Sequence, residues 1–172
     1  MMARMAWAPP LSADEDLRVR RVARFLSYEA YLLDHFAFDQ WLDLYTDDAT
    51  YWVPLEANQA DPFDTHSLIY DDKRLMQVRV RQQSHPRAHA RLPLTRTVHQ
   101  VGNVLVRGAA DADEVEVNST LVLFEYRNER QRSFAATVVH RLLPWEGEYK
   151  IRLKRVDLIN SESELDGIAF LF

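Results

Sequence analysis

Cysteine is absent from this 172-residue chain. Disulfide bonds, thiolate nucleophiles, zinc ribbons and cysteine-ligated iron–sulfur clusters are therefore excluded from it. A Rieske centre is excluded as well, because such a centre needs two cysteines beside its two histidines. Glycine is scarce too, with four residues, and no glycine-rich loop of the dinucleotide-binding or P-loop type is present.

Long apolar runs and an excess of positive charge are also missing. No stretch approaches about eighteen consecutive apolar residues, so the sequence predicts no transmembrane helix, and no apolar core of a signal peptide follows the first residues. The net charge is −5 and the isoelectric point is about 5.7, which leaves no basic field to hold nucleic acid. We therefore expect a soluble cytoplasmic protein without a nucleic-acid or membrane partner.

What is present fits an ordinary globular domain. Hydrophobic residues make up 47% of the chain and charged residues 27%, as in other folded proteins, and the length is that of one domain. Pro9 and Pro10 cannot sit together inside a helix. They separate an N-terminal arm, residues 1–12, from a single domain over residues 13–172.

Helical periodicity governs the first half of this domain. Ser12 and Glu15 have the spacing of a capping box, in which the hydroxyl and the carboxylate each bind a free backbone amide at the start of a helix. Apolar residues at helical spacing extend this helix to about Asp34. The pattern then predicts a short helix over Phe38–Tyr45, a strand over Thr50–Pro54 and a third helix over Ser67–Gln82.

The second half changes to the period-two alternation of strands. Short, turn-like links join the strands, which implies an antiparallel meander. Helices first and a strongly curved sheet second are typical of an α+β fold, with the helices packed on one face of the sheet. The four predicted strands are Thr97–Arg107, Glu114–Arg127, Ser133–Leu143 and Glu148–Ile159.

Glu29 interrupts the apolar stripe of the first helix, between Leu26 and Leu32. A carboxylate in that position is costly unless it is paired or hydrogen-bonded. It could serve as a general acid or base with a raised pKa inside a cavity, or it could pair with an arginine from the sheet. We favour the structural role, because many buried carboxylates perform no chemistry.

Three further polar residues alternate with apolar ones on the predicted strands. His140 should share a face with Val138, and Arg155 and Asp157 should share a face with Ile151. A histidine near an aspartate inside a cone is the arrangement of a dehydratase or isomerase, with the histidine as base. It is equally the pattern of a hydrogen-bonded polar network within a sheet, which is the interpretation we favour.

His85 and His89 have the four-residue spacing that can place two metal ligands on one helical face. Pro86 and Pro93 bracket this stretch and leave little room for a regular helix. A non-haem iron site also needs a carboxylate in register, and none lies nearby. The sequence therefore predicts no metal site here.

Five segments, in this order along the chain, carry a family resemblance. They are Glu29–Asp34 (EAYLLD), Trp41–Tyr45 (WLDLY), Asp48–Pro54 (DATYWVP), Thr95–Val104 (TRTVHQVGNV) and Arg155–Leu158 (RVDL). The segments resemble the small (β) subunit of aromatic-ring-hydroxylating dioxygenases, which are Rieske non-haem iron oxygenases. The resemblance covers almost the whole chain after Ser12.

The resemblance implies a cone of the nuclear-transport-factor-2-like (SnoaL-like) type, with N-terminal helices on a strongly curved, mainly antiparallel sheet. It also implies a structural subunit without a cofactor, which trimerises and supports a catalytic α subunit, commonly in an α3β3 hexamer. In that family the α subunit carries the Rieske [2Fe–2S] cluster and a mononuclear non-haem iron, and it adds dioxygen to an aromatic compound in its degradation. The electrons come from NAD(P)H through a reductase and a ferredoxin, which the β subunit meets only indirectly.

The polar residues of these segments and strands are interpreted as structural hydrogen-bonders or subunit contacts, not as catalytic groups. This set comprises Glu29, Arg96, His99, Asn103, His140, Arg155 and Asp157. The final residues, Ala169–Phe172, are apolar. Exposed, they would be a hydrophobic liability, so we expect a subunit contact to bury them.

Two other hypotheses stay open at the level of sequence. The first is a self-sufficient cone-fold dehydratase, isomerase or cyclase that uses His140 with Asp157 or Glu29. It predicts a pocket with a histidine and a carboxylate about 3 Å apart. The second is a non-catalytic binder of a small molecule, with an apolar cavity and no such pair. Fold alone does not separate these functions, because one scaffold hosts many of them.

Overall fold

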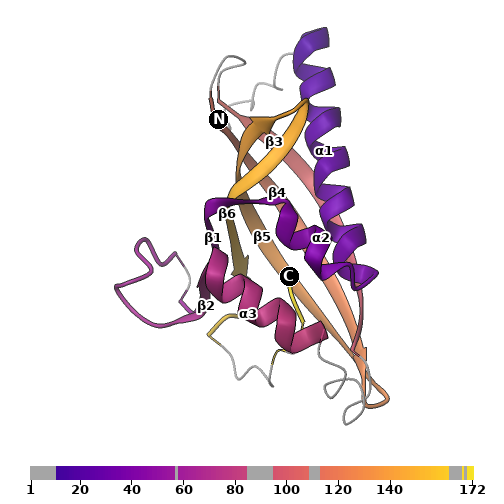
Figure 1. The fold of residues 1–172 in the computed structure, drawn as a ribbon, viewed down its shortest axis with the longest axis vertical. Helices are drawn as coiled ribbons and strands as arrows, with labels where there is room; N and C mark the ends of the chain where they lie inside the picture. Colours follow the sequence, from indigo (N-terminus) through magenta and orange to yellow (C-terminus); the bar gives the residue numbers. More distant parts are fainter. Residues whose placement is uncertain (1–10, 57, 85–94, 109–112, 163–167, 169) are drawn as a thin grey trace, which may run out of the picture.

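The structure is a computed structural model that describes residues 11–56, 58–84, 95–108, 113–162, 168 and 170–172. Figure 1 shows a long helix lying along a curved sheet, with two shorter helices near one end of it. The helices are α1 (Ala13–Asp34), α2 (Phe38–Asp43) and α3 (Lys73–Ser84). The strands are β1 (Tyr45–Pro54), β2 (Ser67–Asp72), β3 (Arg96–Arg107), β4 (Val115–Arg127), β5 (Arg130–Trp145) and β6 (Glu148–Leu158).

Helix α1 begins at the predicted capping box. The Ser12 hydroxyl accepts a hydrogen bond from the Glu15 amide at 3.3 Å, and the Glu15 carboxylate accepts one from the Ser12 amide at 2.8 Å. One face of the helix is apolar and buried, through Val22, Phe25, Leu26, Leu32 and Leu33. Burial of such side chains contributes about 1.5–3 kcal/mol each and packs α1 against the sheet.

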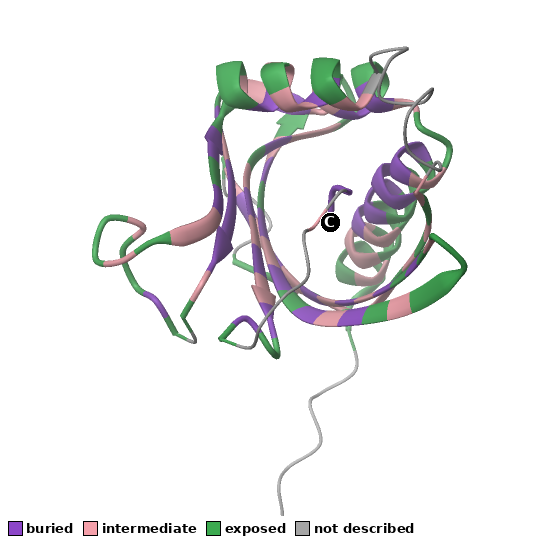
Figure 2. Ribbon diagram, turned by 90° about the horizontal axis from the view of Figure 1, so that it is seen from below, coloured by how far each residue is buried: buried purple, intermediate pink, exposed green. Residues whose placement is uncertain are grey.

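The described strands form one six-stranded sheet in the order β2-β1-β6-β5-β4-β3. Strands β3 to β6 make the predicted antiparallel meander, and β1 pairs with β6 in parallel. Buried residues alternate with more exposed ones along β4 and β5, which gives the sheet an inner and an outer face. The sheet curls around the end of the chain (Figure 2). The predicted α+β cone is confirmed.

The third predicted helix is wrong in its first part. Ser67–Asp72 forms strand β2, which pairs antiparallel with β1 and places Tyr70 opposite Trp52. Alternate residues of this segment are buried, as in a strand. The free edge of β1 offers backbone partners to this segment, and that pairing prevails over the helical spacing of its side chains. The helix itself starts at Lys73.

The second predicted helix is too long, and the strand after it too short. Helix α2 ends at Asp43, and β1 starts at Tyr45, five residues before the predicted strand. The cause is again a distant partner. The backbone oxygen of Leu44 accepts a hydrogen bond from the amide of Ile151 at 2.8 Å, so the chain joins β6 directly after the six residues of α2.

The last residues lie inside the cone. Phe170, Leu171 and Phe172 are 6%, 2% and 0% exposed. The rings of Phe170 and Phe172 pack on Phe134 of β5, with centroids 5.1 and 6.0 Å away. The expectation of a subunit contact is therefore wrong for these three residues, because the chain's own core covers them. Ala169 lies outside the described residues.

Candidate functional site

The interior of the cone holds a buried carboxylate surrounded by hydrogen-bond donors. Oε1 of Glu29 accepts from Nζ of Lys154 at 2.7 Å, from Nε1 of Trp41 at 3.2 Å and from the hydroxyl of Tyr45 at 3.2 Å. Oε2 accepts from Nε2 of His140 at 3.1 Å. We call these five residues the Glu29 cluster. They come from α1, α2, β1, β5 and β6, so the carboxylate ties five elements together.

The register of the sheet explains how two of these donors meet Glu29. His140 of β5 lies directly opposite Lys154 of β6, and both side chains face inward, at 3% and 4% exposure. The predicted arginine partner for Glu29 is wrong, because the inward position of β6 that faces α1 holds a lysine. Lys154 was not singled out by sequence, since it stands among other cations on a strand.

The electrostatics keep this carboxylate ionised. Burial alone would raise the pKa of Glu29, but the charge of Lys154 and the charge and hydrogen bond of His140 outweigh it and hold the pKa well below its usual range. Burial lowers the pKa of His140 against the opposing pull of Glu29. Burial, and then the charge of Glu29, raise the pKa of Tyr45, whose hydroxyl stays a donor.

The arrangement meets one condition of general acid–base catalysis and fails two others. His140 and Glu29 are 3.1 Å apart, as a cone-fold enzyme requires. A carboxylate with so low a pKa, however, is a weak base and carries no proton to donate at neutral pH. The cavity beside the pair has a volume of about 10 Å³, close to the minimum of about 10–15 Å³ that one water molecule needs. No substrate fits there.

The chain itself fills the rest of the interior. Nζ of Lys154 donates to the backbone oxygen of Phe172 at 2.6 Å, and the amide of Phe172 donates to the hydroxyl of Tyr51 at 3.0 Å. Nε2 of His99 lies 3.0 Å from the backbone oxygen of Leu171. Buried side chains of β6, β1 and β3 therefore hold the backbone of the final residues.

His99 also connects β3 to the end of α1. Its Nδ1 lies 2.6 Å from Oδ1 of Asp34, and its backbone amide donates to Oδ2 at 3.0 Å. The Thr97 hydroxyl donates to Oδ1 at 3.1 Å. Asp34 was not singled out by sequence, although it ends the first of the five family segments.

Arg155 and Asp157 lie on the outer face of the sheet. Arg155 donates to both carboxylate oxygens of Asp157, at 2.8 and 2.7 Å, and its guanidinium carbon stands 4.3 Å from the centre of the Trp52 ring. Asp157 pairs in register with Thr137, on the face opposite to His140. The hypothesis of a His140–Asp157 pair is therefore wrong.

The expected face of these two residues was wrong for a local reason. Ile151 and Lys154 are both buried although they are three residues apart. The pairing of β5 with β6 shifts register between Arg141 and Leu142, and such an irregularity resets the alternation of the strand. Arg155 consequently faces outward, away from Ile151.

Arg96 and Asn103 belong to the edge strand β3. The Arg96 guanidinium stands 4.9 Å from the centre of the Tyr126 ring, and Nδ2 of Asn103 donates to the Thr120 hydroxyl at 3.1 Å. Asn103 has a φ of 50° at a register shift of the β3–β4 pair. Asparagine tolerates this left-handed conformation better than most residues.

A family model described as the ring hydroxylating β subunit matches residues 28–163. The chain belongs to this β-subunit family. The matched range begins beside Glu29 and runs past the end of β6, so it includes the whole Glu29 cluster and every described strand.

Individual relatives of this β subunit agree with the family. The small oxygenase component of the p-cumate 2,3-dioxygenase system of Pseudomonas putida is 32% identical over 78% of this chain and 75% of its own. The β subunit of N,N-dimethyl phenylurea N-demethylase of Sphingobium sp. is 33% identical over 87% and 89%. The crystal structure of the β subunit of benzoate 1,2-dioxygenase of Burkholderia mallei superposes with a TM-score of 0.71 at 27% identity, covering 95% of this chain and 100% of that one.

These similarities separate the hypotheses that the sequence left open. The family model describes a ring hydroxylating β subunit, and the relatives are subunits of dioxygenases and of a demethylase. A self-sufficient dehydratase, isomerase or cyclase is therefore not favoured, although the His140–Glu29 distance that it requires is present. Within the described residues, no three histidine, aspartate or glutamate side chains group in a way that could hold a metal ion. His85 and His89 lie outside those residues. No helix of the described chain is long and apolar enough to cross a membrane.

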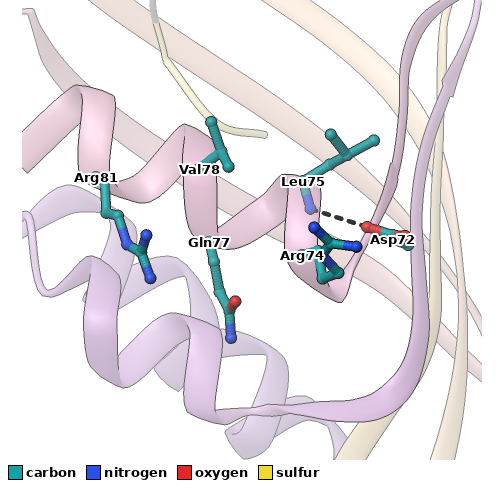
Figure 3. Close-up of a pocket in the computed structure, with 6 residues that line it drawn as sticks. All are labelled: Asp72, Arg74, Leu75, Gln77, Val78 and Arg81. Carbon is teal, nitrogen blue, oxygen red and sulfur yellow. Dashed lines mark hydrogen bonds between the residues drawn. The ribbon is translucent and has the colours of Figure 1, made fainter.

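A groove of about 520 Å³ on the surface of this β subunit runs along α3 (Figure 3). The described residues that line it are Asp72, Arg74, Leu75, Gln77, Val78 and Arg81. The one carboxylate among them caps the helix, since Oδ1 of Asp72 accepts a hydrogen bond from the Leu75 amide at 2.8 Å. These lining residues bring no acid–base pair or nucleophile together, so the groove suggests no chemistry.

Proposed function

We propose that this chain is the structural β subunit of an aromatic-ring-hydroxylating oxygenase and has no active site of its own. The closed cone carries the proposal. Glu29 and His140 stand within reach of each other, yet Phe170–Phe172 fill the space in front of them. The Glu29 cluster in this proposal fixes the helices to the sheet, and His99 fixes β3 to α1.

The redox chemistry belongs, in this proposal, to a catalytic α subunit with a Rieske [2Fe–2S] cluster and a mononuclear non-haem iron. The residues that the structure describes fit neither group. The chain has no cysteine for a Rieske centre, and its described residues bring no set of metal ligands together. What the chain supplies is a rigid body on which the α subunit assembles.

We infer assembly in the cytoplasm as a trimer of this chain and as a hexamer with three α subunits, with a reductase and a ferredoxin as indirect partners. Apolar side chains on the outer face support such contacts: Val98, Phe124 and Tyr126 are 59%, 39% and 40% exposed. Aromatic and arginine side chains are enriched at protein interfaces. The candidate contact residues are Arg96, Asn103, Arg155 and Asp157.

The proposed reaction of the complex is the addition of dioxygen to an aromatic compound in its degradation. The test expresses the α subunit of the same system with and without this chain and assays aromatic dihydroxylation with the electron-transfer proteins present. Turnover should require the α subunit and fall sharply without this chain. Turnover by this chain alone, or full turnover by the α subunit alone, would contradict the proposal. Release of formaldehyde in place of a diol would assign the complex to the reaction class of its demethylase relative.

A further inference from the structure

One ring nitrogen of the Glu29 cluster has no hydrogen-bond partner among the described residues. Nε2 of His140 lies 3.1 Å from Oε2 of Glu29, but Nδ1 of the same ring is buried without a partner. His140 is 3% exposed, so this nitrogen is also out of reach of the bulk solvent. A buried polar atom without a partner destabilises a fold, and most such atoms in proteins are bound by the chain or by ordered water.

The chemistry of the ring defines what the partner of Nδ1 must do. The pKa of Glu29 is held well below its usual range by Lys154 and His140, so its carboxylate only accepts hydrogen bonds, and the shared hydrogen lies on Nε2 of His140. In the neutral ring Nδ1 then accepts a hydrogen bond, and in the protonated ring it donates one. A water molecule serves both states, because it donates and accepts.

A cavity of the size of one water molecule lies beside His140. Its volume is about 10 Å³, at the lower end of the about 10–15 Å³ that a single water needs. Ser119 of β4 lines the same cavity and is 5% exposed. In the pairing of β4 with β5, His140 lies opposite Val117 and Ser119 lies opposite Val138. The two inward-facing polar side chains are therefore diagonal neighbours.

We propose that this cavity is the binding site of a single structural water molecule, which bridges Nδ1 of His140 and the hydroxyl of Ser119. Lys154 lines the cavity as well. Its ammonium group has three hydrogens, of which two are bound, by Glu29 and by the backbone oxygen of Phe172. The third is a further donor at the same cavity. The water thus has two or three polar groups around it, as buried waters in proteins do.

The water extends the Glu29 cluster to one more strand. The cluster joins α1, α2, β1, β5 and β6, and Ser119 adds β4. The water also holds the His140 ring at the nitrogen that does not face Glu29, so that Nε2 stays directed at the carboxylate. This positioning role belongs to the interior of the cone and does not depend on the reaction of the complex.

A crystal structure of the unsubstituted chain tests the site directly. It should show one water molecule within hydrogen-bond distance of both Nδ1 of His140 and the Ser119 hydroxyl. Density without a water at this place, or a water that contacts neither atom, would overturn the proposal. This measurement requires no variant, so it does not depend on how a substitution affects folding.

The variant Ser119→Val tests the bridge in solution. It replaces the hydroxyl by methyl groups that fill the cavity, and valine suits a strand. Nitrogen NMR at pH 7.5 should show the His140 Nδ1 resonance moving toward that of a lone pair without a donor, while Nε2 keeps its hydrogen. The matched control Thr120→Val removes a hydroxyl from the neighbouring position, which is not on the inner face, and should leave the Nδ1 resonance unchanged. An Nδ1 resonance that ignores Ser119→Val would contradict the bridge.

Discussion

Lys154 and Arg155 are neighbours in β6 and each pairs with a carboxylate, but they face opposite sides of the sheet. The Lys154–Glu29 side chains are 5% and 4% exposed, whereas the Arg155–Asp157 side chains are 20% and 27% exposed. Removing one partner inside leaves an uncompensated charge away from water. Outside, water and counter-ions take over the lost partner. The Lys154–Glu29 ion pair therefore stabilises the fold, whereas the fold depends little on the Arg155–Asp157 ion pair, which can serve recognition.

The largest expected effect is that of Lys154→Met on the inner face. The substitution leaves the Glu29 carboxylate buried without its cation and should lower the free energy of unfolding by about 3–5 kcal/mol. Urea denaturation of the isolated chain at pH 7.5 measures this loss.

The matched control is the double variant Glu29→Gln/Lys154→Met. It removes both charges, while the glutamine side-chain oxygen can still accept from Trp41 and Tyr45 in place of the carboxylate. Most of the stability should return. A double variant as unstable as the single one would show that the loss comes from packing around the lysine stem or from the lost hydrogen bond to Phe172. The contrast between the two faces would then not rest on the Glu29 charge.

Acid should weaken the inner face in two steps. The pKa values of His140 and Glu29 lie below their ordinary values of 6.5 and 4.5, so the unfolded chain binds these protons more tightly. The stability that each group contributes is fully present above its ordinary pKa. It is lost as the pH falls toward the pKa that the group has in the folded chain. The free energy of unfolding should therefore fall below pH 6.5 and again below pH 4.5, by at most about 1.4 kcal/mol per pH unit for each group.

Urea titrations between pH 7.5 and 3.5 measure this dependence, and the Glu29→Gln/Lys154→Met variant identifies its lower step. The variant keeps His140 and should keep the decline below pH 6.5, but it should lack the part that Glu29 contributes below pH 4.5. Equal slopes for both proteins in that lower range would assign the acid sensitivity to other carboxylates, such as the exposed Asp48, whose pKa is also lowered.

Local patterns predicted the elements that depend on neighbours in sequence. The capping box at Ser12 starts α1, and period-two alternation places the four strands of the meander close to their observed bounds. The fold class and the family segments followed from the same evidence. These features could be predicted because each rests on a spacing of a few residues.

The features that the sequence did not predict depend on partners that are distant along the chain. The inward direction of Lys154 follows from a register shift against β5, and β2 forms only because β1 offers it an edge. The apolar sequence of Phe170–Phe172 does not indicate whether the chain's own core or another subunit covers it. The inner site was therefore predicted only in part: the sequence singled out Glu29 and His140, but not Lys154, which binds Glu29.

On the outer face, backbone conformation should matter more than single contacts. Asn103→Ala forces alanine into a φ of 50° and removes the hydrogen bond to Thr120, at a cost of about 1–2 kcal/mol. Asn103→Gly also loses that hydrogen bond but tolerates the conformation, and it should stay within about 0.5 kcal/mol of the unsubstituted protein. Thermal unfolding distinguishes the two. Equal losses for both variants would assign the effect to the side-chain contact.

The smallest effect on the isolated chain is expected for the outer pair. Arg155→Met/Asp157→Asn removes an ion pair and the stacking of Arg155 on Trp52. A solvent-exposed pair contributes about 0–1 kcal/mol, and this half-buried pair should contribute little more, because the double substitution leaves no single charge unpaired. Urea denaturation should therefore show a change of at most about 1 kcal/mol. Co-purification with the α subunit should suffer more, because the same residues are candidate contacts. A loss of stability as large as that of Lys154→Met would show that the outer pair also holds the fold, since the double substitution leaves no buried charge to explain such a loss.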